Sequence, residues 1–307
     1  MTSLLNEEST FNIIYGYRCN YKCEGCCVGS NIVTDTSKDP DLDKILESIK
    51  LLPKVIKIKE SEDYWQSGMI TLLGGEPLMY WEERIVPIAR AVREQFPNVR
   101  VNIFSNGHLL GRHADKVIDL MSEISATLTI SQHLIGDLES PLGKRWVAST
   151  QKFLNNPRIE KIHDQHYTVI GNDWANIHFH DSEDWFTWYK QTPEGIKPYA
   201  SNNPTASMKY GCASGRICSS LYENRLYKCS SLAMLPGLLS YLGQSDDTDW
   251  EKYLNYPYVD LFALKDTDIK YHTNNYGKPV TYCDMCNNQP SNIIRWKDRK
   301  QWMVLQK

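Results

Sequence analysis

The stretch FNIIYGYRCNYKCEGC, residues 11–26, decides how the rest of the chain is interpreted. Its first part, residues 11–17, is rich in β-branched and aromatic residues and predicts a strand. Its second part places Cys19, Cys23 and Cys26 in one C-x3-C-x2-C loop. Because a [4Fe–4S] cluster normally takes four thiolates, three in one loop predict a cluster whose fourth iron is open to another ligand. Such a cluster can do chemistry on a bound molecule.

Three later segments repeat the pattern of a strand followed by a turn. They are residues 69–73 before Gly74-Gly75-Glu76-Pro77, residues 99–104 before Ser105-Asn106-Gly107, and residues 126–130 before Ser131-Gln132-His133. Segments with helical periodicity separate them, at residues 41–51, 81–96 and 112–124. This alternation predicts an α/β fold with a parallel sheet, and all four loops are expected at its carboxyl edge, where ligands bind. We predict a partial (β/α)6 barrel, completed by strands near residues 165–170 and 175–180.

The three-cysteine loop after the first strand and the GGEP turn after the second resemble the radical S-adenosylmethionine (SAM) superfamily, over roughly residues 10–180. The resemblance implies that SAM chelates the open iron and is split into methionine and a 5′-deoxyadenosyl radical. It also implies a flavodoxin- or ferredoxin-type reductant. The family usually has an aromatic residue before the third cysteine, where this chain has Gly25, so adenine contacts must come from elsewhere. A ferredoxin-like electron carrier and a zinc site are the alternatives.

The resemblance also indicates which residues bind SAM. Glu76 is expected beside the SAM amino group, because a partly desolvated ammonium needs an acceptor. The alternative is a turn carboxylate that caps the following helix. Ser131 and Gln132 are candidates for the ribose hydroxyls or ordinary loop residues, and Asn106 either does the same or shapes its turn. The expected SAM-binding set is Gly74, Gly75, Glu76, Pro77, Ser105, Asn106, Ser131 and Gln132.

Two histidines complete the catalytic candidates, together with Glu76. His178 and His180 alternate within a strand-like segment, residues 176–181, and therefore share one face of the strand. If that face is the barrel interior, they can contact substrate or accept a proton. The alternative is a pair of half-exposed strand histidines.

A second cysteine group follows a segment rich in turn formers, residues 191–211, which we predict to be a linker. It consists of Cys212, Cys218, Cys229, Cys283 and Cys286, with a hairpin turn expected around residues 223–225. Four thiolates suit zinc and an iron–sulfur cluster almost equally. The order of cysteines and hairpin resembles the Twitch domain, the short relative of the SPASM domain. This implies an auxiliary [4Fe–4S] cluster on Cys212, Cys229, Cys283 and Cys286, and Cys218 is the alternative to Cys212.

We therefore divide the chain into a radical SAM barrel (1–190), a linker (191–211) and a small auxiliary-cluster domain of hairpin and helix (212–307). Composition and charge bear on the partners and the location of the protein. The 307 residues carry a net charge of −3, so no overall basic field favours nucleic acid. Residues 1–10 lack the apolar core of a signal peptide, and no run is long enough to span a membrane. Nine cysteines in such a chain favour metal binding in a reducing compartment, so we expect a cytoplasmic protein without a membrane partner.

The expected activity is oxidation of a substrate C–H position, assisted by the auxiliary cluster. Dehydrogenation of a small molecule is favoured, since the barrel and Twitch order is similar to the radical SAM dehydrogenases that act on 2-deoxy-scyllo-inosamine. Peptide modification ranks lower, because no leader-binding segment precedes the first strand, near residue 11. Nucleotide modification is third. An iron–sulfur electron-transfer protein is the alternative of another class.

Overall fold

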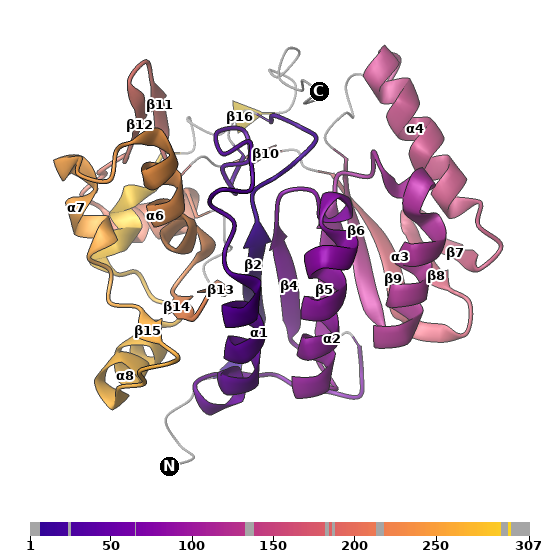
Figure 1. Ribbon diagram of the computed structural model, residues 1–307, viewed down its shortest axis with the longest axis horizontal. Coiled ribbons are helices and arrows are strands. Elements are labelled where there is room, and N and C mark those ends of the chain that lie inside the picture. Colours follow the sequence, from indigo (N-terminus) through magenta and orange to yellow (C-terminus); the bar gives the residue numbers. More distant parts are fainter. Residues whose placement is uncertain are drawn as a thin grey trace.

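One large sheet runs through the centre of the computed structural model (Figure 1). The structure describes residues 7–23, 26–64, 66–132, 138–181, 184–185, 188–212, 218–289 and 294–295. Within them, this sheet has ten strands in the order β15-β14-β13-β2-β4-β5-β6-β9-β8-β7. The strands that are parallel to one another are β13 (Cys218–Tyr222), β2 (Thr10–Gly16), β4 (Met69–Gly74), β5 (Arg100–Ser105), β6 (Ala126–Gln132) and β9 (Asn172–Asp181).

Antiparallel strands extend the sheet at both edges. They are β8 (His166–Val169) and β7 (Ile159–His163) on one side, and β14 (Arg225–Tyr227) and β15 (Val259–Asp260) on the other. Three small pairs lie outside it: β1 (Glu7–Glu8) with β3 (Lys57–Ile58), β10 (Asp184–Trp185) with β16 (Ile294–Arg295), and β11 (Lys190–Thr192) with β12 (Gly195–Lys197).

Helices α1 (Leu42–Leu51), α2 (Val86–Gln95) and α3 (Leu110–Ile124) lie over one face of the sheet (Figure 1). Each presents buried apolar residues, such as Ile45, Val92 and Met121, to the alternate strand residues that point the same way. The helix expected at residues 81–96 begins as one π-helical turn, η3 (Trp81–Ile85), before α2. Helix α4 (Pro141–Leu154) follows β6 in the chain. The predicted α/β fold class, with its large parallel sheet, is confirmed.

The opposite face of the sheet is polar and still buried. In register across five adjacent strands stand Ser220, Asn12, Thr71, Asn102 and Thr127, each less than 7% exposed. Asn12 donates a hydrogen bond to Ser220 (3.4 Å). Buried polar side chains cost free energy unless they are hydrogen-bonded. The row has further partners within the fold, since Asn102 accepts from the Thr129 hydroxyl (2.9 Å) and Thr127 bonds to Tyr64, whereas the helical face is an ordinary apolar core.

The barrel differs from the predicted (β/α)6 pattern in one detail. The strands expected near residues 165–170 and 175–180 are present, but β8 runs antiparallel to β9. Their connection is only Ile170 and Gly171, with Gly171 at φ +83°. A parallel pair needs a crossover of about a dozen residues or more, so this short turn permits only a hairpin. The sixth parallel strand is instead β13, which comes from the C-terminal part and pairs with β2.

Residues 191–211, expected to be a linker, are folded. They contain most of the hairpin β11–β12 and helix α5 (Pro204–Tyr210), whose N-cap Asn203 accepts a hydrogen bond from the Ala206 amide (3.0 Å). The turn formers that suggested a linker thus form a hairpin turn and a helix cap. Within the described residues, no helix has both the length and the apolar composition needed to cross a bilayer.

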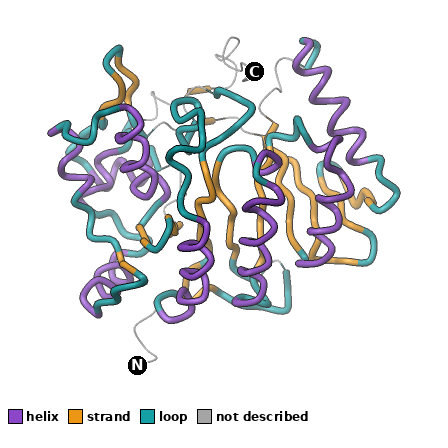
Figure 2. The backbone as a smooth tube through the Cα atoms, in the orientation of Figure 1, coloured by secondary structure: helices purple, strands orange, loops and turns teal. Residues whose placement is uncertain are grey.

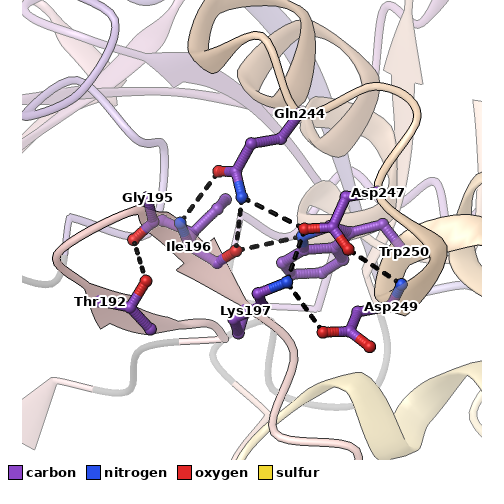
Figure 3. A network of polar contacts seen from close by, with 8 residues as sticks. All are labelled: Thr192, Gly195, Ile196, Lys197, Gln244, Asp247, Asp249 and Trp250. Atoms are coloured by element: carbon purple, nitrogen blue, oxygen red, sulfur yellow. Dashed lines mark hydrogen bonds and ion pairs between the residues drawn. The ribbon is translucent and has the colours of Figure 1, made fainter.

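A polar network fastens the hairpin to α7 (Thr248–Leu254) and to the loop between it and α6 (Ser230–Leu242), as Figure 3 shows. Gln244 accepts from the Ile196 amide (3.0 Å), and Trp250 Nε1 donates to the Ile196 carbonyl (3.2 Å). Lys197 pairs with Asp247 (2.6 Å) and Asp249 (2.9 Å). Helix α8 (Asp266–Asn275) and the short helix η4 (Thr281–Met285) follow.

Candidate functional site

The cysteine loop lies at the carboxyl edge of the sheet, directly after β2, where the long loop is seen in Figure 2. The turn after β4 supports it through two backbone hydrogen bonds, from Gly75 to the Gly16 carbonyl and from Glu76 to the Arg18 carbonyl (both 3.0 Å). A Cβ at Gly75 would come within 2.0 Å of the Arg18 oxygen. The sequence predicts that this glycine allows close approach of a ligand. In the structure the close neighbour is the backbone of the cysteine loop itself.

A second support of the loop was not predicted from the sequence. Asp39 accepts a hydrogen bond from the Tyr17 amide (2.8 Å) and from the Tyr80 hydroxyl (2.8 Å). The same Tyr80 oxygen accepts from the Arg18 amide (2.7 Å). Burial raises the pKa of Asp39. Two separate segments, at Asp39 and at residues 75–80, thus fix the backbone just before Cys19, although Asp39 stands in a stretch with no helical or strand periodicity.

The three thiols of the loop are close enough to affect the pKa of Cys19. Burial, followed by the Glu76 carboxylate, raises the pKa of Cys19, and the thiols of Cys23 and Cys26 add to the rise. The Tyr21 amide donates to the Cys19 sulfur (3.4 Å), and so does the Asn106 side chain (3.8 Å). Hydrogen bonds to sulfur tune iron–sulfur clusters, and bound metal deprotonates a thiol outright. Soft thiols with N–H donors aimed at sulfur therefore fit an iron–sulfur cluster.

Glu76 is almost completely buried, with 1% exposure, and its carboxylate is fully engaged. One oxygen accepts from the Leu78 amide (3.3 Å) and the Ser105 hydroxyl (2.8 Å), and the other accepts from the Asn106 amide (2.9 Å). Glu76 therefore caps the short helix η2 (Pro77–Met79), which is the alternative role predicted for it from the sequence. It also joins the loop after β4 to the loop after β5. Burial raises the pKa of Glu76 to about 7.

The raised pKa predicts a pH dependence of stability that depends on Glu76. Since the carboxyl has a pKa of about 7 when folded and an ordinary value of 4.5, the folded state binds the proton more tightly. The contribution of Glu76 to stability should therefore fall as pH rises through this window, by about 3 kcal/mol at about 1.4 kcal/mol per pH unit, while the lowered pKa of His178 acts in the opposite direction. Denaturant unfolding of the metal-free protein between pH 4.5 and 7.5 measures it. Glu76→Gln should abolish this contribution to the slope, whereas Glu83→Gln, on an exposed residue, should keep it. An unchanged slope in Glu76→Gln would contradict the assignment.

The remaining predicted SAM-binding residues gather at the same edge. Asn106 donates to the Asn20 side chain (2.7 Å) and accepts from the His108 amide (3.0 Å), so it both shapes its turn and contacts the cysteine loop. Ser131 is buried and stands opposite His180 in the β6–β9 pair. Gly74 and Gln132 end β4 and β6, Pro77 begins η2, and His133 lies outside the described residues. The structure thus places all four predicted loops along one edge.

The auxiliary cysteines are brought together from distant parts of the chain. The side chains of Cys212, Cys229, Cys283 and Cys286 line one pocket. Cys212 follows α5, Cys229 is the N-cap of α6, and the other two belong to η4 and its end. Burial raises the pKa of Cys229 to about 12, and the neighbouring thiols of Cys212 and Cys283 contribute. The side chain of Cys218 lies outside the described residues.

Lys228 lines the same pocket and is the residue that sequence reasoning missed there. Burial lowers the pKa of its ammonium, while the thiols of Cys283, Cys229 and Cys212 oppose that shift. Its Nζ donates to the Asn275 carbonyl (2.5 Å). A cation beside four thiolates offsets the charge of the buried group that they hold. This donor set therefore fits a fully ligated cluster. Among the described residues, no three Cys, His, Asp or Glu side chains form a site for a single metal ion.

His178 and His180 share the polar face of the sheet, as the sequence predicts, because they pair with Thr129 and Ser131 of β6. Their surroundings differ. His180 is exposed and lies edge-on to Phe104, with 6.5 Å between ring centroids. His178 is half-buried, and burial, together with the neighbouring His166, lowers its pKa to about 4.

No curated protein matches the sequence. Among solved structures, the chain is similar to BtrN in complex with AdoMet and 2-DOIA, at 14% identity over 92% of this chain and 94% of that one, with a TM-score of 0.45. It is also similar to anSMEcpe with bound AdoMet, at 15% identity over 47% of this chain and 40% of that one, with a TM-score of 0.32. Residues 8–154, which include the cysteine run, match the family model of a 4Fe-4S single cluster domain.

Proposed function

We propose that the protein is a radical SAM enzyme. It cleaves SAM reductively and uses the resulting 5′-deoxyadenosyl radical to abstract hydrogen from a substrate C–H bond. The observation that carries this proposal is the union of the three-thiol loop with the GGEP turn, through the hydrogen bonds of Gly75 and Glu76 to the loop backbone. An electron carrier needs no open iron beside a ligand-binding sheet edge.

In this proposal the protein's own residues position the reactants. Cys19, Cys23 and Cys26 would hold the first [4Fe–4S] cluster, which supplies the electron that cleaves SAM. Asn106 and the Tyr21 amide donate to the Cys19 sulfur and hold that ligand in place. Glu76 fixes the loops that follow β4 and β5, so that Ser105, Asn106 and the residues after β6 can surround SAM.

Oxidation of the substrate is the favoured reaction, because a second thiol set can take up the remaining electron. Cys212, Cys229, Cys283 and Cys286 would hold the auxiliary [4Fe–4S] cluster of a Twitch-like domain. One apolar cluster, which includes Trp188 and Leu238, contacts both Cys26 of the first loop and Cys229 and Cys286 of the pocket. Such packing excludes water between the two groups of cysteines. Solvent exposure is one of the factors that set the reduction potential of an iron–sulfur cluster.

The substrate that fits this arrangement is a small polar molecule. The buried polar row lies on the sheet face opposite helices α1 to α3, and its hydroxyl and amide groups suit a polar ligand better than an apolar one. A flavodoxin- or ferredoxin-type protein would supply the electron. Among the described residues no cysteine is in a disulfide, which suits the reducing cytoplasm.

Anaerobic turnover tests the proposal. Reconstituted protein, reduced by dithionite or by flavodoxin, should convert SAM to methionine and 5′-deoxyadenosine, both measured by chromatography. Reduction without SAM cleavage, in protein that holds its full iron, would instead favour the electron-transfer function.

A further inference from the structure

Three histidines stand side by side across the edge of the sheet, at the end of the polar face. His163 of β7 pairs with His166 of β8, and His166 pairs with His178 of β9. Residues directly opposite in a sheet share a face, so the three rings form one row. The row begins at the exposed His163, passes the buried His166, and ends at His178, next to Thr129.

The hydrogen bonds of His166 fix one of its protons. Asn176 donates through Nδ2 to the Asp173 carbonyl (2.9 Å), so its Oδ1 is the atom that faces His166 Nε2 (2.9 Å). A carbonyl oxygen only accepts. His166 therefore carries a proton on Nε2.

The other contacts of the pair require two further protons. His163 Nδ1 faces the Asp164 carbonyl (3.0 Å), which also only accepts, so Nδ1 carries a proton. Between the rings, His163 Nε2 and His166 Nδ1 lie 3.0 Å apart, and this contact needs one proton. Two neutral imidazoles have two N–H groups in total, whereas these three contacts use three. The pair therefore holds one positive charge.

The charged groups around the row do not cancel that charge at His178. Asp164, the carboxylate next to His163, is itself paired with Lys161 (2.8 Å). Arg100 of β5 acts on His178 in the same direction as the two histidines. The rings of His166 and His178 are 4.3 Å apart between centroids, at an angle of 42°. A cation at that distance opposes a second charge on His178.

We propose that His163 and His166 share one proton beyond two neutral rings, and that this charged pair keeps His178 as a neutral imidazole on the substrate side of the sheet. His163 and His166 are thus positioning residues. A neutral ring can accept a hydrogen bond from a substrate hydroxyl or donate one to the substrate oxygen, and the positive charge behind it favours partial negative charge on that oxygen. This role of His178 rests on the proposed function, whereas the protonation states do not.

Nitrogen-15 NMR of the imidazole rings tests the proton count. The full chain, labelled at histidine, should show one imidazolium shared by His163 and His166 at pH 7, and a neutral His178 whose midpoint is near pH 4. Two neutral rings at positions 163 and 166 would overturn the proposal. The NMR measurement needs no SAM cleavage, so its result tests the proton count independently of the proposed enzyme function.

Substitutions at the exposed His163 test the effect on His178. His163→Gln keeps a donor toward His166 but removes the charge, so the midpoint of His178 should move from about 4 toward its ordinary value of 6.5. His163→Lys restores a positive charge and should leave the midpoint low. His113→Gln, which removes a histidine of α3 outside the row, should also leave it low. If His178 titrates alike in His163→Gln and in the wild type, the proposal is wrong.

Discussion

Replacing Cys19, Cys23 and Cys26 together by alanine is expected to abolish SAM cleavage and to remove about four of about eight irons per chain. The three thiols belong to the loop to which the GGEP turn is bonded at the sheet edge. Without them, no iron remains to bind SAM or to pass it an electron. Iron analysis after anaerobic reconstitution, with chromatography of 5′-deoxyadenosine, measures both losses. The iron that remains should belong to the auxiliary cysteines.

Cys27→Ala is the matched control for this substitution. Cys27 adjoins Cys26 and is also partly buried against apolar residues, but the hydrogen bond from Trp188 goes to its backbone carbonyl (3.0 Å). Alanine keeps that carbonyl, so iron content and SAM cleavage should stay close to the wild type. Reductive cleavage that survives in the triple variant, or iron loss in Cys27→Ala equal to that of the triple variant, would show that the loop has been misassigned.

The sheet edge was predictable because each of its motifs is local. A strand-like run followed by cysteines, glycines or polar turn residues identifies both the strand and the direction in which it ends, as at Gly74 and Ser105. The direction of β8 was not predictable in this way, because a strand pattern does not say which neighbour it pairs with. The two-residue connection at Ile170 and Gly171 was the available signal. In residues 191–211, turn formers predicted a linker, although the same residue types also build hairpins and helix caps.

The clustering of the candidate cysteines was predictable, and the residues that support them less so. Cysteine spacing points to the metal-binding residues, whereas Asp39 and Lys228 carry no local signature and act only through long-range contacts. The histidine pair did leave a signal. His163 and His166 flank the two residues Asp164 and Gln165, and Gln165 has φ +61°. A two-residue turn places its flanking residues opposite each other, so the spacing itself implies contact between the two rings.

Replacing Cys283 and Cys286 by alanine should separate SAM cleavage from product formation. Both thiols line the auxiliary pocket, and a four-iron cluster cannot persist on Cys212 and Cys229 alone. Iron should fall by about half, from about eight to about four per chain. Because the first loop is anchored by β2, β4 and Asp39, it should still cleave SAM. The substrate radical would then lack its electron acceptor, so 5′-deoxyadenosine should appear without oxidised product.

Single substitutions at the two candidate cysteines refine this prediction. Cys212→Ala should damage the auxiliary cluster, since Cys212 lines the pocket and contributes to the raised pKa of Cys229. Cys218→Ala is the matched control and should keep both clusters, because Cys218 begins β13, opposite Thr10 of β2. Metal analysis of the wild type decides the remaining alternative. About four irons with one tightly held zinc per chain would contradict the auxiliary cluster, and the four C-terminal thiols would then be a structural zinc site that takes no part in the reaction.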